Sequence, residues 1–240
     1  MVVRKTLVVV IVAIALVAVV LGVGYILLTQ SACSQGGVAL GSAAGFAVLA
    51  GSTVTNTGST TVTGDLGVSP GTAVTGFPPG TVVGTIHKTD TAAAGAVADL
   101  TIAYNDAAGR TLCPVSVAGN LGGQTLTPGL YKSTSGLAIS SGDLTLDALG
   151  NANAVFIFQM VSSLTTTEGR QIILAGGAKA SNVFWQVGSS ATLGTNSTFM
   201  GTIMADQAVT LNTGATLHGR AMARIGAVTL DASTVTKPAA

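Results

Sequence analysis

Only 8% of the 240 residues are charged, whereas soluble domains usually carry about 25% charged residues. The formal net charge is +1, and without Arg4 and Lys5 near the start, eight basic residues stand against nine acidic ones. This balance excludes the basic patch of a nucleic-acid-binding protein, and the sequence has no run of acidic residues that would form an acidic tail. The low number of charged residues also leaves few titratable groups for catalysis. The length is sufficient for one folded domain with a buried core and a short N-terminal segment.

The first 29 residues form a targeting segment. Arg4 and Lys5 precede an uncharged apolar run from Leu7 to Leu28. That run is longer than the roughly 7–15 residues of a signal-peptide core and matches the roughly 20 residues that a membrane-spanning helix needs. Residues 1–29 are therefore a signal peptide or an N-terminal membrane anchor. Both alternatives place the rest of the chain outside the cytoplasm, because the positive end of such a segment stays inside. Residues 30–42 are small and polar, and we expect them to be a linker.

Only two cysteines occur, Cys33 and Cys113. They could pair in an exported protein, but nothing in the sequence brings them together. We therefore expect two unpaired thiols, or the loss of Cys33 with a signal peptide. Residues 30–33 lack the aliphatic residue expected before a lipidated cysteine, so a lipoprotein is a less favoured alternative.

From Phe46 onward the pattern becomes that of β-strands. Threonine alternates with valine over residues 53–55 and 61–63, which indicates strands with one buried face. Asn-Thr-Gly and Ser-Pro-Gly sequences between these stretches are typical of tight corners.

Residues 89–109 predict the only helix after the N-terminal segment. Thr89 or Asp90 can cap its first turn, because a short side-chain oxygen accepts hydrogen bonds from free backbone N–H groups. Apolar residues then recur at helical spacing, and Gly109 provides a stop. The apolar positions are Ala93, Ala96, Val97, Leu100, Ala103 and Tyr104. One helix with one apolar stripe cannot form its own core, so we expect it to lie along the flank of the β-structure.

Strands resume from Val117 and continue to the end of the sequence, with no second domain expected. Residues 155–159 and 182–187 resemble each other, and both hold consecutive large apolar residues. Strands covered on both faces have this composition, so we expect the two to be equivalent neighbours with the helix over one side.

The last fifty residues nearly repeat themselves at a spacing of about 18–20, which is typical of a solenoid in which each repeat is one coil. Thr192, Thr210 and Thr229 hold one position of the repeat, and each is followed by a leucine. Because successive side chains of a strand point to opposite faces, the leucines Leu193, Leu211 and Leu230 would fill the interior. The threonines would then stack outward in a column, about 4.8 Å apart from coil to coil.

Catalytic and metal-binding arrangements are not indicated. His87 and His218 are far apart in sequence, and neither belongs to a zinc motif or an evident triad. Asp143 and Asp147 would share one outward face of a strand end, which favours a solvated edge over glycosidase chemistry. We therefore expect no enzyme activity, no metal and no cofactor.

The array of threonines is the feature of the sequence that indicates a function. Threonine is a good strand former on any solvated face, but ordinary solvated faces also carry charges, and here almost none occur. A rigid, uncharged surface of methyl and hydroxyl groups suits an ordered water lattice, so ice is the expected partner. A repetitive polysaccharide is the alternative, although its sites usually hold stacking aromatic residues, whereas the single Trp185 is expected in the core.

The chain from about residue 40 to 237 resembles the microbial ice-binding protein family found in cold-adapted organisms. The matching stretches are residues 46–58, 64–71, 103–109, 126–131, 153–159, 182–194 and 219–223. The resemblance implies a mainly β fold: a right-handed or irregular three-sided β-solenoid with discontinuous coils, one long helix along its side, and adsorption to ice through one flat face.

Some members of that family carry a Thr-(Ala/Gly)-x-(Thr/Asn) pattern on the ice-binding face. Here the pattern occurs at residues 57–60, 72–75 and 213–216. Together with the repeat, it gives nine candidate ice-binding residues: Thr57, Thr60, Thr72, Thr75, Thr192, Thr210, Thr213, Thr216 and Thr229. Relatives often have cysteines where this chain has Lys132 and Ser181, which argues against a family-type disulfide at Cys113.

The sequence thus predicts an exported, non-enzymatic, monomeric ice-binding domain over residues 43–237. The alternative is an extracellular structural or adhesive solenoid that presents a face to glycan or to another cell.

Overall fold

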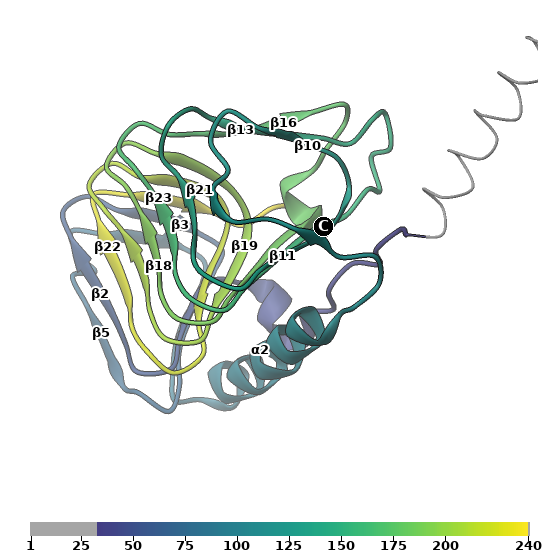
Figure 1. Cartoon of the computed structure of the whole chain (residues 1–240). Coiled ribbons are helices and arrows are strands. Elements are labelled where there is room, and N and C mark those ends of the chain that lie inside the picture. The colour runs from purple at the N-terminus through teal and green to yellow at the C-terminus, as the bar shows by residue number, and fades with distance from the viewer. Residues whose placement is uncertain (1–32, 240) are drawn as a thin grey trace, which may run out of the picture. The chain divides into compact units, whose positions relative to one another are not determined.

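Short strands pair in parallel into three sheets, which form the walls of a solenoid with one long helix beside it (Figure 1). The computed structural model describes residues 33–239, so the predicted targeting segment over residues 1–29 lies outside the described residues. Residues from Gln35 onward belong to one compact unit. Within the described part of the chain, no helix combines the length and apolar character needed to cross a membrane.

The largest sheet, sheet A, contains twelve strands. In spatial order its main path is β6 (Thr81–Val83), β3 (Thr61–Thr63), β23 (Thr234–Thr236), β21 (Thr216–Ala223), β19 (Thr198–Ala205), β17 (Val183–Val187), β14 (Phe156–Met160), β11 (Gly129–Ser133) and β8 (Val115–Ser116). A branch runs from β21 through β1 (Phe46–Ala50) and β4 (Asp65–Val68) to β7 (Ile86–Lys88).

Two further sheets complete the walls. Sheet B has the order β5 (Ala73–Thr75), β2 (Thr53–Thr57), β22 (Val228–Asp231), β20 (Val209–Leu211), β18 (Ala191–Leu193), β15 (Leu164–Thr166), β12 (Leu137–Ile139) and β9 (Gly119–Asn120). Sheet C consists of β10 (Thr125–Leu126), β13 (Leu144–Asp147) and β16 (Ile172–Ala175). The predicted β-solenoid is confirmed, including the equivalence of residues 155–159 and 182–187, which pair as β14 and β17.

The coils are stacked out of sequence order. β2 pairs with β22, and β3 pairs with β23, so the first coils of the chain lie against the last one. In Figure 1 the purple-blue strands β2 and β5 therefore stand beside the yellow β22. The chain then has to reach the opposite end of the stack, where β8 begins. Helix α2 (Thr91–Gly109) connects the two ends, and its 19 residues at about 1.5 Å each are long enough to pass about six strands.

Helix α2 packs on the outer side of sheet A, as predicted. Its Ala96, Leu100 and Ala103 are 0% exposed and form a cluster with side chains from several strands. The strand residues of this cluster include Leu49, Leu130, Ile157, Phe184, Met204 and Met222. Consecutive large apolar residues in β14 and β17 are thus explained by burial on both sides. Two short 3₁₀ helices, η1 (Gly41–Gly45) and η2 (Ala180–Asn182), are the other helical elements within residues 33–239.

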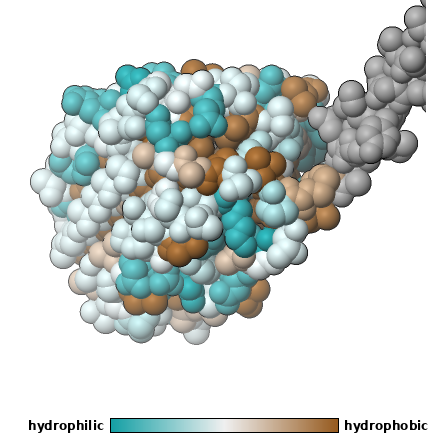
Figure 2. Space-filling view, viewed as in Figure 1, coloured by the Kyte–Doolittle hydropathy of each residue, from teal (hydrophilic) through white to brown (hydrophobic). Residues whose placement is uncertain are grey.

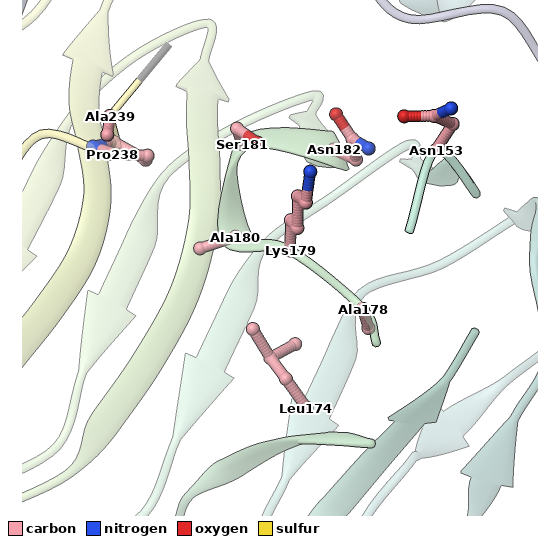
Figure 3. Close-up of a pocket in the computed structure, with 9 residues that line it drawn as sticks. All are labelled: Asn153, Leu174, Ala178, Lys179, Ala180, Ser181, Asn182, Pro238 and Ala239. Atoms are coloured by element: carbon pink, nitrogen blue, oxygen red, sulfur yellow. The ribbon is translucent and has the colours of Figure 1, made fainter. Parts of the chain in front are cut away.

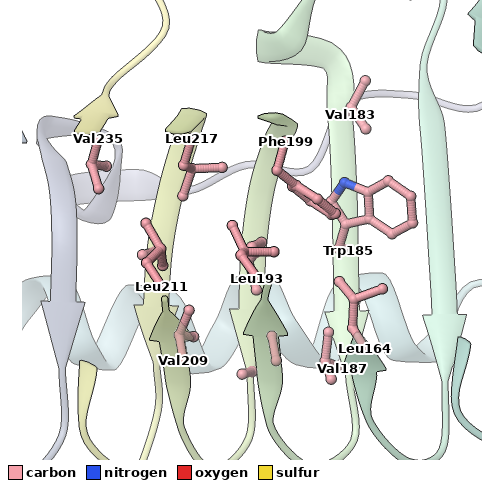
Figure 4. Close-up of a cluster of buried hydrophobic side chains, with 14 of the residues drawn as sticks. Leu164, Val183, Trp185, Val187, Leu193, Phe199, Val209, Leu211, Leu217 and Val235 are labelled. Atoms are coloured by element: carbon pink, nitrogen blue, oxygen red, sulfur yellow. The ribbon is translucent and has the colours of Figure 1, made fainter. Parts of the chain in front are cut away.

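The interior of the solenoid is filled by side chains stacked from coil to coil (Figure 4). Leu193, Leu211 and Leu230 are each 0% exposed, which confirms their predicted inward position. Trp185 is also fully buried, with its ring 3.9 Å from that of Phe158 between centroids. The expected core role of Trp185 is therefore correct.

Two expectations need correction. Both Cys33 and Cys113 are disulfide-bonded, so the prediction of unpaired thiols is wrong. Sequence spacing could not reveal this, because the proximity of two cysteines is set by the tertiary structure. In addition, Val38 and Leu40 of the expected linker are buried in the cluster under α2, so this part of residues 30–42 belongs to the folded unit.

Asp90 caps α2, and we expect its loss to weaken the start of the helix. Its Oδ1 accepts from the Ala93 N–H at 2.8 Å, and its Oδ2 lies 2.7 Å from His87 Nδ1. The Ala93 hydrogen bond, followed by the contact with His87, lowers the pKa of Asp90 below its ordinary value. Because the folded state favours the charged carboxylate, this stabilisation is present above the ordinary Asp pKa of about 3.9 and is lost as the pH falls through the lower folded value.

Asp90→Ala should therefore speed amide hydrogen exchange in the first turn of α2 at neutral pH, and less so at strongly acidic pH. Asp90→Asn, which keeps an oxygen acceptor, is the matched control. Equal exchange in Asp90→Ala and the unmodified chain would contradict the capping role.

Candidate functional site

Six threonines stand in register across six neighbouring strands of sheet B. The pairings place Thr75 beside Thr55, Thr55 beside Thr229, and so on along the sheet. We call these residues the sheet B threonine column: Thr75, Thr55, Thr229, Thr210, Thr192 and Thr165. The column ends where Ala138 and then Asn120 take the equivalent position.

The column is held from beneath by the core. In β20 the neighbours of Thr210 are Val209 and Leu211, and both are 0% exposed. The same alternation of buried, outward and buried residues occurs in β18 and β22. A one-residue slip would expose these apolar side chains, so the register of the threonines is fixed by burial.

The surroundings of the column are small and nearly free of charge. The outward positions two residues before the threonines are partly buried and are occupied by Thr53, Ala73, Ala227, Ala208, Ser190 and Ser163. Asp231, at the end of β22, is the only charged residue in the strands of sheet B. Its carboxylate accepts a hydrogen bond from the Thr213 hydroxyl, which holds the charge at the margin of the face.

The geometry makes a rigid lattice of hydroxyl and methyl groups. Strands of a sheet lie about 4.8 Å apart, and outward residues recur at about 6.6 Å along each strand, so the surface has two fixed periods. Threonine is branched at Cβ and has few side-chain conformations, which limits the disorder of each group. Thr55 also donates a hydrogen bond to the Thr229 hydroxyl at 3.3 Å, which links the first coils to the last.

Three of the four titratable groups singled out in the sequence, His87, Asp143 and Asp147, have structural roles, and His218 is exposed on β21. His87 contacts Asp90, and its ring packs edge-on against Phe46 at 5.3 Å between centroids. Asp143 accepts from the Gln171 N–H at 3.0 Å, and Asp147 accepts from the Leu149 N–H at 2.9 Å. Among the residues that the structure describes, no three His, Cys, Asp or Glu side chains gather as metal ligands would.

Comparisons with known proteins match this arrangement. The family model described as Ice-binding-like matches residues 48–236. The chain belongs to this ice-binding-like family. An ice-binding protein of Nostoc sp. (strain HG1) is 50% identical over 197 residues, covering 82% of this chain and 72% of the relative. One of Flavobacterium frigoris (strain PS1) is 42% identical over 217 residues, covering 84% and 76%. A crystal structure of an ice-binding protein from an Antarctic biological consortium superposes with a TM-score of 0.84 at 58% identity, covering 85% of this chain and 92% of that one.

Eight of the nine candidate residues of this family member fall in three places. Four of them, Thr75, Thr192, Thr210 and Thr229, lie in the sheet B threonine column. Thr57, Thr72 and Thr213 are exposed at the ends of sheet B strands or in the turns next to them. Thr216 lies on another wall of the solenoid, where it begins β21.

Thr60 is unsuited to surface contact. It is only 1% exposed, and its hydroxyl accepts from the Ser233 N–H at 3.1 Å. The short sequence pattern that selected Thr60 does not distinguish a surface threonine from one that turns inward at a corner, so we leave Thr60 out of the face.

Thr55 and Thr165 belong to the column but are missing from the sequence-based set. Thr165 precedes Thr192 by a longer interval than the repeat, because β16 and η2 lengthen that coil. Thr55 lies far from Thr229 in sequence and meets it only because β2 docks on β22. Alternation in Thr53–Thr57 was a signal for an outward Thr55, but it did not reveal the neighbour.

One pocket outside the sheet B threonine column has a lining with little catalytic chemistry. This pocket of about 660 Å³ lies between the start of β17 and the end of the described chain (Figure 3). Lys179 is its one charged lining residue, beside the amides of Asn153 and Asn182. Paired acid and base groups are absent from this lining.

The face of the molecule shown in Figure 2 is largely of intermediate hydropathy, as expected for threonine, serine, alanine and glycine.

Proposed function

We propose that this chain binds ice through the outer face of sheet B. The observation that carries the proposal is the sheet B threonine column, in which six threonines repeat in register on a face with one marginal charge. The names of the relatives support the same partner, because they are ice-binding proteins.

The chemistry of the column suits ordered water. Each threonine hydroxyl donates and accepts hydrogen bonds, so it can anchor a water molecule, while the neighbouring methyl group favours a cage of water around it. Since the backbone is fixed in the sheet and the side chains are stiff, little conformational entropy is lost when the face meets a lattice. A long charged side chain would disturb both effects. The strands of sheet B carry no Lys, Arg or Glu, and Asp231 is their one charged residue.

Adsorption explains how such a face acts on crystals. Each contact is weak, but many contacts act together because the face is rigid. Ice held at adsorbed molecules must grow as curved fronts between them, which lowers the local freezing point and slows recrystallisation.

We further propose that the domain is exported, non-catalytic and monomeric, and needs no cofactor. The disulfide-bonded state of Cys33 and Cys113 supports an oxidising compartment outside the cytoplasm. An uncleaved segment from Leu7 to Leu28 would attach the domain to a membrane and could hold a cell to ice.

The direct test is to watch single ice crystals in a nanolitre osmometer with the purified protein. We expect faceted crystals whose growth stops within a temperature gap below the melting point, and small grains in a recrystallisation assay. Round crystals that grow freely in a sample shown to be folded by circular dichroism would refute ice binding and favour the adhesive alternative.

A further inference from the structure

The coil at one end of the solenoid is uncharged and has open strand edges. It consists of β8, β9 and β10, each of which is the last strand of its sheet. We call residues 111–126, which comprise this coil and the loop that leads into it, the terminal coil. No Asp, Glu, Lys or Arg occurs between Arg110 and Lys132. Edge strands in water are usually protected by charged side chains, and the terminal coil lacks this protection.

Two large apolar side chains of the terminal coil are exposed. Leu112 is 48% exposed and Val115 is 51% exposed. The opposite end of the stack also has an exposed apolar residue, since Val83 on β6 is 58% exposed, but there β7 ends at the exposed Lys88. Apolar exposure alone therefore does not decide which end has a partner, and the path of the chain supplies the missing argument.

The chain enters the folded unit beside the terminal coil. Gln35 Nε2 donates a hydrogen bond to the Leu112 carbonyl at 3.0 Å. Arg110, at the end of α2, donates to the Gly37 carbonyl at 2.9 Å. In Figure 1 the purple chain from Gln35 accordingly passes beside the teal segment that follows α2. These bonds fix the point of entry on the terminal coil.

The apolar run from Leu7 to Leu28 ends a short distance along the chain from this point. Only residues 29–34 separate Leu28 from Gln35. An extended chain spans at most about 3.6 Å per residue, so the terminal coil would lie within about 25 Å of the end of the run. If the run is held in a bilayer, the terminal coil is the part of the solenoid tethered next to the lipid surface.

The sheet B threonine column stops before it reaches the terminal coil. It begins with Thr75 in β5, at the opposite end of the sheet, and continues to Thr165 in β15. In the last two strands, β12 and β9, its position is taken by Ala138 and Asn120. A coil that lies against lipid cannot reach ice, so threonines would have no ice to contact there.

We propose that the terminal coil docks on the surface of the lipid bilayer that holds the run from Leu7 to Leu28. This inference rests on the proposed membrane attachment and is separate from ice binding. Leu112 and Val115 enter the boundary between headgroups and acyl chains, where burial of their apolar surface is favourable. The open strand edges stay among hydrated headgroups, because unpaired backbone groups do not enter the hydrocarbon core. The solenoid then stands on its end, with Thr75 far from the membrane.

The test places a tryptophan at Val115 in the full chain, reconstituted into phosphatidylcholine vesicles. Val83→Trp is the matched control, because Val83 is similarly exposed but lies on β6, at the other end of the main path of sheet A. Trp185 is buried and gives the same background in both variants. Each variant is checked for an unchanged circular dichroism spectrum and melting temperature, and flotation of the vesicles shows that the protein is bound. Lipids brominated near the headgroup end of the acyl chains then quench any tryptophan in contact with them.

We expect brominated lipid to quench the added fluorescence of Val115→Trp several-fold more than that of Val83→Trp. Emission should shift to the blue only for Val115→Trp. Adding Leu112→Asp should remove the difference between the two ends, because a charged side chain in the contact opposes its transfer to the lipid boundary.

Equally slight quenching of Val115→Trp and Val83→Trp in protein that floats with the vesicles would overturn the docking. A blue shift of Val115→Trp without quenching would indicate a second copy on the terminal coil and would overturn it as well. Protein that does not float would refute the membrane attachment and the docking together. Growth arrest of ice, measured on the same proteins, reports on ice binding separately, so failure of one proposal is distinguished from failure of the other.

Discussion

Thr210→Tyr is expected to reduce growth arrest several-fold while leaving the melting temperature unchanged. Thr210 occupies an interior place in the sheet B threonine column, with Thr229 on one side and Thr192 on the other. A tyrosine there would stand above the plane and separate its neighbours from a flat crystal, so more than one threonine's contact would be lost. The fold should tolerate the change because the side chain points outward and Thr210 is only half-buried.

Conservative variants at the same position separate the two halves of the threonine side chain. Thr210→Val keeps the shape and removes the hydroxyl, whereas Thr210→Ser keeps the hydroxyl and removes the methyl group. We expect both to be milder than Thr210→Tyr, and Thr229→Tyr to reproduce the full effect. If Thr210→Tyr and Thr229→Tyr both kept normal growth arrest, the sheet B column would not be an ice-binding surface.

Trp185→Ala is expected to have the largest effect on stability. Trp185 is 0% exposed, lies between the rings of Phe158 and Phe199, and donates from Nε1 to the Met200 carbonyl at 3.0 Å. Truncation would remove these contacts, leave a cavity and leave a carbonyl without its donor. Large-to-small aromatic substitutions of this kind cost about 3–5 kcal/mol. The free energy of unfolding from urea denaturation measures the loss.

Trp185→Phe is the matched control. It retains a ring for stacking but removes the N–H donor, so we expect an intermediate loss that includes about 1–3 kcal/mol for the unpaired carbonyl. Unfolding free energies for Trp185→Ala and Trp185→Phe that both equal that of the unmodified chain would show that this stack does not support the solenoid.

Local pattern was sufficient to predict the solenoid and its helix. The 18-residue repeat aligns equivalent positions of successive coils, and alternation follows from the period of a β-strand. Leu193, Leu211 and Leu230 could therefore be assigned to the interior, and Thr192, Thr210 and Thr229 to the surface. Asp90 and the apolar stripe of residues 93–104 likewise identified α2, because capping and helical spacing are local properties.

Contacts between distant coils were decided by the tertiary structure. Thr55 completes the column only because β2 docks against β22, and Thr165 joins it across a lengthened coil. The burial of Thr60 and the disulfide-bonded state of both cysteines also depend on where corners and segments meet in space. The sequence by itself therefore determined which residues face outward within a coil, since that follows from strand geometry. The order in which coils stack, and with it the extent of each flat face, was decided by the packing of side chains far apart in the chain.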